Sequence, residues 1–235
     1  MIPLRVLAYW QHQFGGGRQA FDDRAVSLTI DASLDTVRAA MILTREDGTA
    51  AVALQPPLAE RAGLLDANPL PLPDVRARLA ASGIVLNDPD FLFYRAADRP
   101  LEQAPSDAVR RLTEADRDAF DRFYRSASQQ DRDDAWVEFD HAAVFGSFDG
   151  DRLICAASMV LWRESPLVDL GVLTLPDARG RGHARTVIAA IADHAVGAGH
   201  EPQYRCQTDN HASVALARSA GFQSLGRWEV IRTPD

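Results

Sequence analysis

The sequence predicts an α+β protein, and three observations lead to this prediction. Apolar residues between positions 184 and 195 recur at the spacing of one helix face. Asp149-Gly150-Asp151 separates two apolar runs, as the turn of a β-hairpin does. The chain has 235 residues, of which 46% are hydrophobic and 25% charged, values typical of a globular protein with one large domain or two modest ones.

The first 95 residues are expected to form a small α+β lobe of unknown role. Runs at 41–45 and 49–54 flank Glu46-Asp47-Gly48, which predicts a hairpin. A short helix is predicted at 74–82, because Pro73 precedes it and Gly83 follows it. Residues 91–94 follow as a strand. The polar segment 96–105, with Pro100 and Pro105, is predicted to be a linker.

The region from 106 to 235 is expected to hold a second domain with strands and helices in a regular order. Thr113 is a predicted helix N-cap, with Asp116 three residues later as in a capping box. Pro176 is expected to end a strand, and Gly197 and Gly199 to end a helix. The predicted elements are a strand at 109–112, a helix from 113, strands at 143–148, 153–160 and 167–175, a helix from 184, a strand at 203–207, a helix at 211–220 and a strand at 222–231.

Composition excludes several classes of function. The net charge is −8 and the chain contains no lysine, so nucleic acid is not an expected partner. No apolar stretch reaches the ~20 residues that span a bilayer, and Met1 to Trp10 do not form a signal peptide, so we expect a soluble, cytoplasmic protein without a membrane partner. Cys155 and Cys206 are expected to be buried free thiols. The histidines show no metal-ligand spacing, so no metal is expected. Trp136, Trp162 and Tyr204 are expected in the core.

The segment from Val172 to Arg185 predicts an anion site. A strand leads through Arg179-Gly180-Arg181-Gly182 into an amphipathic helix. The first N–H groups of a helix have no intrahelical partner and lie at the positive end of its dipole, so a phosphate or pyrophosphate is the expected guest. A Walker A loop needs a lysine, and a dinucleotide fingerprint needs a third glycine, so neither motif fits.

In this segment the sequence resembles the GNAT superfamily of acyl-CoA-dependent N-acyltransferases. Arg179-Gly180-Arg181-Gly182-His183-Ala184 matches the pyrophosphate loop of that family. A second motif is matched by Asn210, Ser213, Leu216, Gly221 and Phe222. The resemblance covers about residues 106–235, and the motif residues are similar to those of a bacterial, FR47-like branch of the family. It implies a mixed, mostly antiparallel sheet that splays where acetyl-CoA enters, and transfer of the acetyl group to an amine by direct attack on the thioester.

The resemblance also implies the roles of individual residues. Backbone groups of Val172, Leu173 and Thr174 would pair with the pantetheine arm, and a bulge in this strand would free an N–H for the thioester carbonyl. Asn210 would bond the pantetheine arm, with Ser213 beside it. The pyrophosphate would be held by the segment Arg179, Gly180, Arg181, Gly182, His183, Ala184 and Arg185.

The catalytic groups depart from the family pattern. Many members carry a tyrosine as the acid at the position of Ala217, so Ser213, a water or no residue serves here. The fifth strand, which sometimes holds the base, has Arg205 instead. Asp169 is the first candidate for the general base, and Glu138, Asp140 and His141 come next; a base acting through water is an open alternative.

Two other functions stay open at this point. Ala217 and Arg205 motivate a CoA-binding regulatory or structural protein that has lost catalysis. A nucleotide-binding module would use the same anion site for ATP or NAD. The acidic charge favours cationic acceptors such as polyamines, aminoglycosides or a protein N-terminus, and the acceptor is unidentified. The N-terminal lobe, interpreted as a degenerate copy of the same fold, would wall the acceptor pocket or mediate a homodimer.

Overall fold

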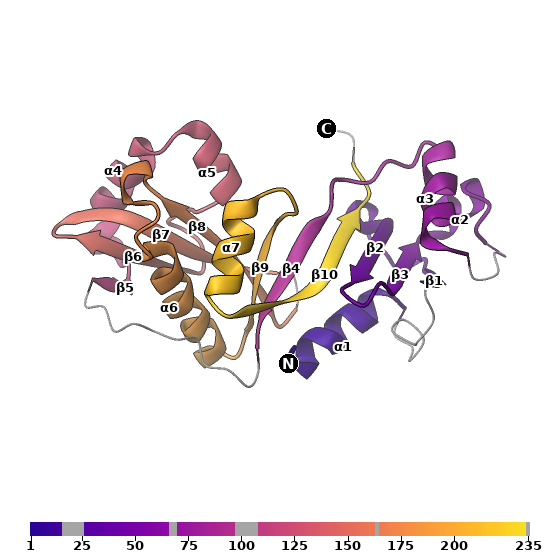
Figure 1. The fold of residues 1–235 in the computed structure, drawn as a ribbon, viewed down its shortest axis with the longest axis horizontal. Helices are drawn as coiled ribbons and strands as arrows, with labels where there is room; N and C mark the ends of the chain where they lie inside the picture. The colour runs from indigo at the N-terminus through magenta and orange to yellow at the C-terminus, as the bar shows by residue number, and fades with distance from the viewer. Residues whose placement is uncertain (16–25, 66–69, 97–107, 163–164, 234–235) are drawn as a thin grey trace. The chain divides into compact units, whose positions relative to one another are not determined.

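The computed structural model describes residues 1–15, 26–65, 70–96, 108–162 and 165–233. These residues form two compact units. Unit 1 comprises residues 1–3, 93–205 and 211–223, and unit 2 comprises residues 4–92, 206–210 and 224–235. The described strands are mostly antiparallel and are flanked by helices, so the predicted α+β class is confirmed (Figure 1).

The sheet of unit 1 has neighbouring strands in the order β5-β6-β7-β8-β9. All described pairs are antiparallel except β8 with β9, which is parallel. The predicted hairpin at Asp149-Gly150-Asp151 is confirmed, because β6 pairs with β7 and Gly150 has a φ of 57°. The bounds are β5 Val109–Arg111, β6 Ala143–Asp149, β7 Arg152–Leu161, β8 Leu167–Thr174 and β9 Glu201–Gln207.

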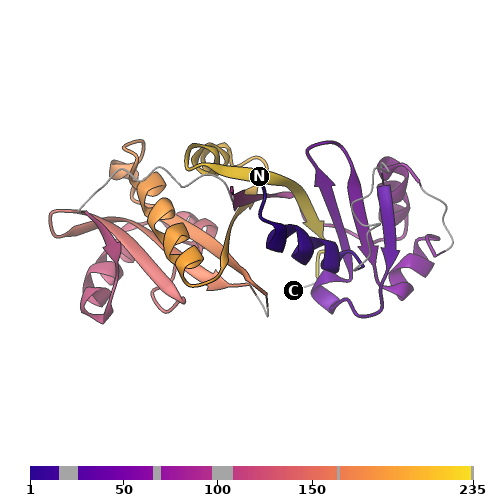
Figure 2. The same ribbon diagram turned by 90° about the horizontal axis from the view of Figure 1, so that it is seen from below.

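Helices cover both faces of this sheet (Figure 2). Val144 of β6 packs in a core cluster with Phe120 of helix α4, whereas the ring of its neighbour Phe145 lies 5.4 Å from that of His194 in α6. Successive strand residues point to opposite faces, so α4 and α6 lie on opposite sides. The helices are α4 Arg117–Ser126, α5 Gln129–Ala135, α6 His183–Gly197 and α7 His211–Ser219, with 3₁₀ turns η3 Glu114–Asp116 and η4 Pro176–Ala178.

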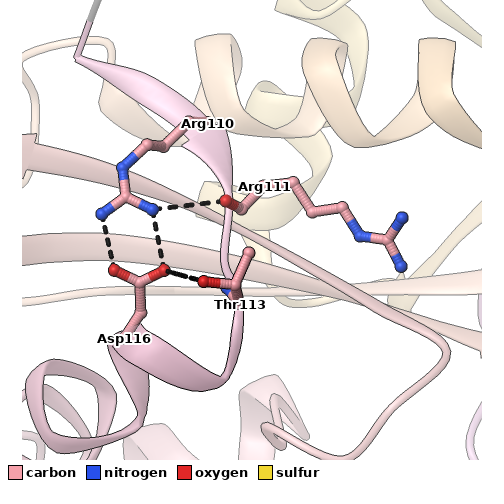
Figure 3. A network of polar contacts seen from close by, with 4 residues as sticks. All are labelled: Arg110, Arg111, Thr113 and Asp116. Atoms are coloured by element: carbon pink, nitrogen blue, oxygen red, sulfur yellow. Dashed lines mark hydrogen bonds and ion pairs between the residues drawn. The ribbon is translucent and has the colours of Figure 1, made fainter.

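A polar network fixes the start of α4 (Figure 3). The Asp116 carboxylate accepts a hydrogen bond from the backbone N–H of Thr113 at 2.9 Å, which confirms the predicted capping box. Arg110 donates to both carboxylate oxygens, at 2.8 and 2.6 Å. The Arg110 guanidinium, with desolvation opposing it, holds the pKa of Asp116 well below its usual range. The network therefore joins β5 to the helix that follows it.

Unit 2 contains a sheet in the order β1-β3-β2-β10. β2 and β3 form the predicted hairpin, and the predicted helix after Pro73 is observed as α3. Residues 224–235 cluster with residues 4–92, because Gly226–Val230 pair with Met41–Arg45. The bounds are α1 Leu4–Gln13, β1 Val26–Ile30, η2 Thr36–Arg38, β2 Ala40–Arg45, β3 Ala50–Leu54, α2 Pro56–Arg61, α3 Leu72–Ala81 and β10 Phe222–Val230. Strand β4, Asp90–Arg95, contributes residues to both units.

Some expectations need correction or fall outside the described residues. Both cysteines are free, and burial raises the pKa of the Cys155 thiol to about 12. Cys206 is half-buried, because it lies one residue from the end of β9, so the prediction that it is buried is wrong. The predicted linker lies outside the described residues except for Ala96. In the part of the chain that the structure describes, no helix is long and apolar enough to cross a bilayer.

Candidate active site

The two parallel strands of unit 1 separate in the middle of β8. β8 and β9 are paired from Leu167↔Glu201 to Leu170↔Tyr204, and the described pairing stops there. β7 stays paired with β8 as far as Cys155↔Thr174. Over Gly171–Thr174, β8 therefore pairs with β7 on one edge and no longer pairs with β9 on the other. This segment contains the predicted residues Val172, Leu173 and Thr174.

The predicted bulge in β8 is wrong. The register between β7 and β8 is unbroken from Leu161↔Val168 to Cys155↔Thr174. A bulge would leave two residues of one strand opposite one residue of the other. Backbone groups of β8 become available in a different way, because β9 turns away after Leu170.

The end of β8 leads to a helix start that is open to a ligand. Gly180 has a φ of 74° and Gly182 a φ of 87°, and a Cβ at either glycine would meet no atom within 4 Å. Gly182 is the N-cap of α6, and no described side chain caps this end. The backbone N–H groups of the first turn of α6 therefore point toward an uncrowded surface, which is the geometry of a helix N-terminal anion site.

The arginine side chains of this loop differ in whether they are paired with other groups. Arg181 and Arg185 are exposed. The Arg179 guanidinium donates to Asp131 at 2.6 Å and to the carbonyl oxygen of Thr174 at 3.2 Å. The hydroxyl of Ser128, and after it the Arg179 guanidinium, lower the pKa of Asp131. Arg179 thus braces the loop against α5, and its charge is shared with a carboxylate.

His183 and Ala184, the other two loop residues predicted to bind a cofactor, begin α6 and are half-buried. The Nδ1 atom of His183 lies 3.1 Å from the hydroxyl of Ser147, a buried residue of β6. This contact fixes the first turn of α6 against the sheet. The backbone of the turn is consequently held in place while its N–H groups stay at the surface.

The second predicted motif lies at the start of α7. Asn210 is exposed and directly precedes the helix, and Ser213 is half-buried in its first turn. Ala217 is fully buried. The position at which the resemblance implies a tyrosine therefore presents only a methyl group, and it is packed inside the protein.

Asp169 lies in a buried polar network at the point where β8 and β9 separate. Its carboxylate accepts hydrogen bonds from Gln203 Nε2 at 3.3 Å and from Arg205 Nη2 at 3.1 Å. Tyr94 Oη donates to Gln203 Oε1. Asp169 and Gln203 are buried, and the Arg205 guanidinium stacks 5.2 Å from the ring centre of Trp162. Sequence reasoning missed Gln203 and Tyr94, which carry no motif.

The remaining base candidates occupy different environments. Glu138 and Asp140 are largely exposed, and Asp140 accepts a hydrogen bond from Arg117 at 2.9 Å. The His141 side chain is only 12% exposed. Burial lowers the pKa of His141, while the nearby charges of Glu138 and Asp140 oppose the shift. A lowered pKa favours the neutral form of His141, which is the state that accepts a proton.

Trp136 corrects another expectation. Tyr204 is buried, as predicted, but Trp136 is 50% exposed and Trp162 is half-buried. Trp136 directly follows α5 and has a left-handed backbone, with a φ of 44°. This conformation ends the helix and directs the indole away from the core.

Among the described residues, no group of three or more His, Cys, Asp or Glu side chains is placed to hold a metal ion.

Comparisons with known proteins identify the domain that carries this site. The model of the Acetyltransferase (GNAT) family matches residues 109–222. Among solved structures, a protein described as a GNAT-family acetyltransferase from Novosphingobium aromaticivorans is 19% identical and has a TM-score of 0.50, with 77% of this chain and 81% of that chain covered. A GNAT-family acetyltransferase from Colwellia psychrerythraea is 16% identical and has a TM-score of 0.52, with 83% and 81% covered. No curated protein matches the chain.

The model of the GNAT family thus matches the part of the chain, residues 109–222, that holds both sequence motifs. The structural likenesses support the fold. The match to this family indicates acetyl transfer as the chemistry of the matched residues. The assignment to an FR47-like branch stays a prediction.

Proposed function

We propose that this protein is an N-acetyltransferase that moves an acetyl group from acetyl-CoA to the amine of a small-molecule or peptide acceptor. One observation carries the proposal: β8 loses its parallel neighbour after Leu170 and then runs into the uncapped N-terminus of α6. A strand edge that has lost its neighbour suits the amide groups of a pantetheine arm, and a helix N-terminus suits a pyrophosphate. The pantetheine arm and the pyrophosphate of CoA would thus bind complementary backbone groups that follow one another along a single segment of the chain.

The residues present fit this ligand. Val172, Leu173 and Thr174 would offer backbone groups to the pantetheine arm. The pyrophosphate would lie against the N–H groups between Gly180 and Arg185. A Cβ at Gly180 or Gly182 would have no atom within 4 Å, so this surface has room for the ligand. Arg181 and Arg185, both exposed, would add positive charge. We carry Asn210 and Ser213 forward as contacts of the pantetheine arm.

The catalytic groups are proposed from their contacts. Asp169 is bonded to both Gln203 and Arg205, so it is better suited to holding Arg205 at the opening between the strands than to accepting a proton. Ser213 stays a candidate donor to the departing sulfur. A CoA thiol has a pKa near that of cysteine, about 8.5, so the thiolate is a tolerable leaving group without strong assistance.

Release of free thiol from acetyl-CoA in the presence of a panel of primary amines tests this proposal. We expect amine-dependent thiol release, inhibited by CoA and unaffected by ATP or NAD. Binding of acetyl-CoA without thiol release from any amine would favour the regulatory protein that Ala217 motivates. Binding of ATP or NAD with no affinity for CoA thioesters would contradict the proposal and indicate a nucleotide-binding module.

A further inference from the structure

Two aromatic side chains from one loop lie beside the point where β8 and β9 separate. Ser158 of β7 is paired with Gly171 of β8, the first residue after the last β8–β9 pair. Directly opposed residues of antiparallel strands point to the same face. Ser158 also pairs with Val144, which packs with α4. Ser158 and Gly171 are therefore on the sheet face that α4 and α5 cover.

His141 is attached to this position through Ser158. Its Nδ1 atom lies 2.8 Å from the hydroxyl oxygen of Ser158, which is fully buried. Its Nε2 atom lies 3.7 Å from a carboxylate oxygen of Glu138. The imidazole is thus held over the β7–β8 pair, at the level of Gly171.

Trp136 reaches the same level from α5. The carbonyl oxygen of Trp136 lies 3.2 Å from the place that a Cβ of residue 171 would occupy, and that of Ala135 lies closer still. Only glycine at 171 lets the end of α5 approach β8 this closely. The Trp136 indole meets the His141 imidazole edge to face, with ring centres 5.3 Å apart and planes at 74°. The exposed indole and the half-buried imidazole are therefore neighbours.

We propose that Trp136 and His141 receive the acceptor, a primary ammonium, and that His141 takes the proton from it. This inference rests on the proposed acetyl transfer. The face of an indole attracts a cation, which explains an exposed tryptophan at this place. In this proposal His141 carries its hydrogen on Nδ1 and donates it to the hydroxyl of Ser158, which leaves the lone pair of Nε2 to accept a proton. Glu138, beside Nε2, stabilises the imidazolium that results.

The atoms balance as follows. The ammonium loses one proton to Nε2 of His141, and the free amine attacks the thioester carbonyl carbon of acetyl-CoA. A C–N bond forms, the C–S bond breaks with its electron pair on sulfur, and the amide nitrogen releases its second proton to water. The CoA thiolate takes a proton from water, directly or through the hydroxyl of Ser213, because Ala217 supplies none, and His141 returns its proton to solvent.

The charges around His141 set the pH dependence. Glu138 and Asp140 face it from its own loop, Arg117 of α4 pairs with Asp140, and burial opposes protonation more strongly than these carboxylates favour it. The pKa of His141 therefore lies below its ordinary value of 6.5. The rate of acetyl transfer should fall as the pH drops through this lowered pKa, because the protonated ring cannot accept a proton.

His141→Gln tests the assignment, with n-butylamine as the probe acceptor and thiol release as the readout. At pH 7 we expect about a 100-fold loss of kcat, the usual contribution of a general base. The loss should shrink toward pH 10, where a much larger share of the amine is already free. A merely structural defect would lower the rate equally at every pH. His12→Gln, the same substitution at an exposed position in unit 2, is the matched control.

Two further variants separate the roles. Trp136→Leu should raise the KM for the amine about tenfold with little change in kcat, since it removes a cation–π contact. Ser158→Ala should lower kcat about fivefold, since it removes one hydrogen bond. Amine-dependent thiol release with an unchanged pH profile in His141→Gln would overturn this inference and leave the proposed function standing. Absence of thiol release in the unaltered protein with every amine would overturn both.

Discussion

Two glycines with nearly the same backbone φ angle serve different purposes in this molecule. Gly48, in the hairpin between β2 and β3, has a φ of 86°, and Gly182, before α6, has a φ of 87°. A Cβ at either position would meet nothing within 4 Å. At Gly48 the neighbouring polar groups bond within the turn: its N–H donates to the Arg45 carbonyl, and Thr49 donates to Asp47 from both its N–H and its hydroxyl.

At Gly182 the backbone donors face outward instead. α6 begins there without a described side-chain cap, and its first-turn N–H groups lie at the positive end of the helix. The comparison shows that a left-handed glycine does not by itself indicate a binding site. The difference lies in whether the surrounding N–H groups are already bonded. The following predictions test that difference, beginning with the largest expected effect on stability.

Gly171 is a third kind of glycine, required for space. Gly171→Ala should destabilise the protein by about 1–3 kcal/mol, because the added methyl group would overlap the carbonyl oxygen of Ala135. Chemical denaturation of the variant measures the loss. Gly197→Ala at the end of α6, where a Cβ meets nothing within 4 Å, is the control and should be neutral or slightly stabilising. Equal losses in both variants would contradict this account.

The hairpin turn should be a structural feature only. Asp47→Ala removes both acceptor bonds to Thr49, and we expect a loss of about 0.5 kcal/mol, since the carboxylate is largely exposed. The Thr49 hydroxyl lowers the pKa of Asp47, so this stability is present at neutral pH and is lost as the pH falls through that lowered value. Thermal unfolding at pH 7 and pH 2 measures both effects. A change in acetyl-CoA affinity in this variant would show that the turn is not merely structural.

The carboxylate beside the α6 loop should act on binding. Asp131→Asn releases the Arg179 guanidinium from its ion pair, and we expect the KM for acetyl-CoA to fall about threefold, more at low ionic strength. Asp47→Asn is the control, because it removes the same charge from an exposed pair with Arg45 in unit 2 and leaves Arg179 in place. Weaker binding in Asp131→Asn would mean that the ion pair holds the loop in its binding conformation.

The sequence predicts the elements of this fold whose signals are local. Gly48, Gly150 and Gly182 mark turns, and the spacing of Val187, Ile188 and Ile191 marks the buried face of α6, which the structure confirms. Helix α5 escapes prediction because none of its residues is buried, so its sequence carries no apolar periodicity. α1 escapes it because only Val6 and Trp10 of that helix are buried.

The sequence predicts only the part of the site that is formed by one continuous segment of the chain. The α6 loop follows from residues 179–184 read in order. The separation of β8 from β9, the pairing of Asp169 with Arg205 and the contact of His141 with Ser158 depend on strands distant in sequence. No local pattern encodes such contacts. The bulge in β8 is implied by the family resemblance alone, and the regular pairing of the strand contradicts it.

Calorimetric titration of acetyl-CoA into three proteins tests the central claim most directly: the unaltered chain, Gly182→Trp and Gly48→Trp. Both substitutions place the same side chain at nearly the same left-handed backbone angle in open space, so their strain is matched. We predict micromolar binding to the unaltered chain and to Gly48→Trp, and affinity lowered by about 100-fold or more in Gly182→Trp, because the indole would occupy the pyrophosphate position at α6. Equal affinity in all three proteins would contradict the assignment of the CoA site.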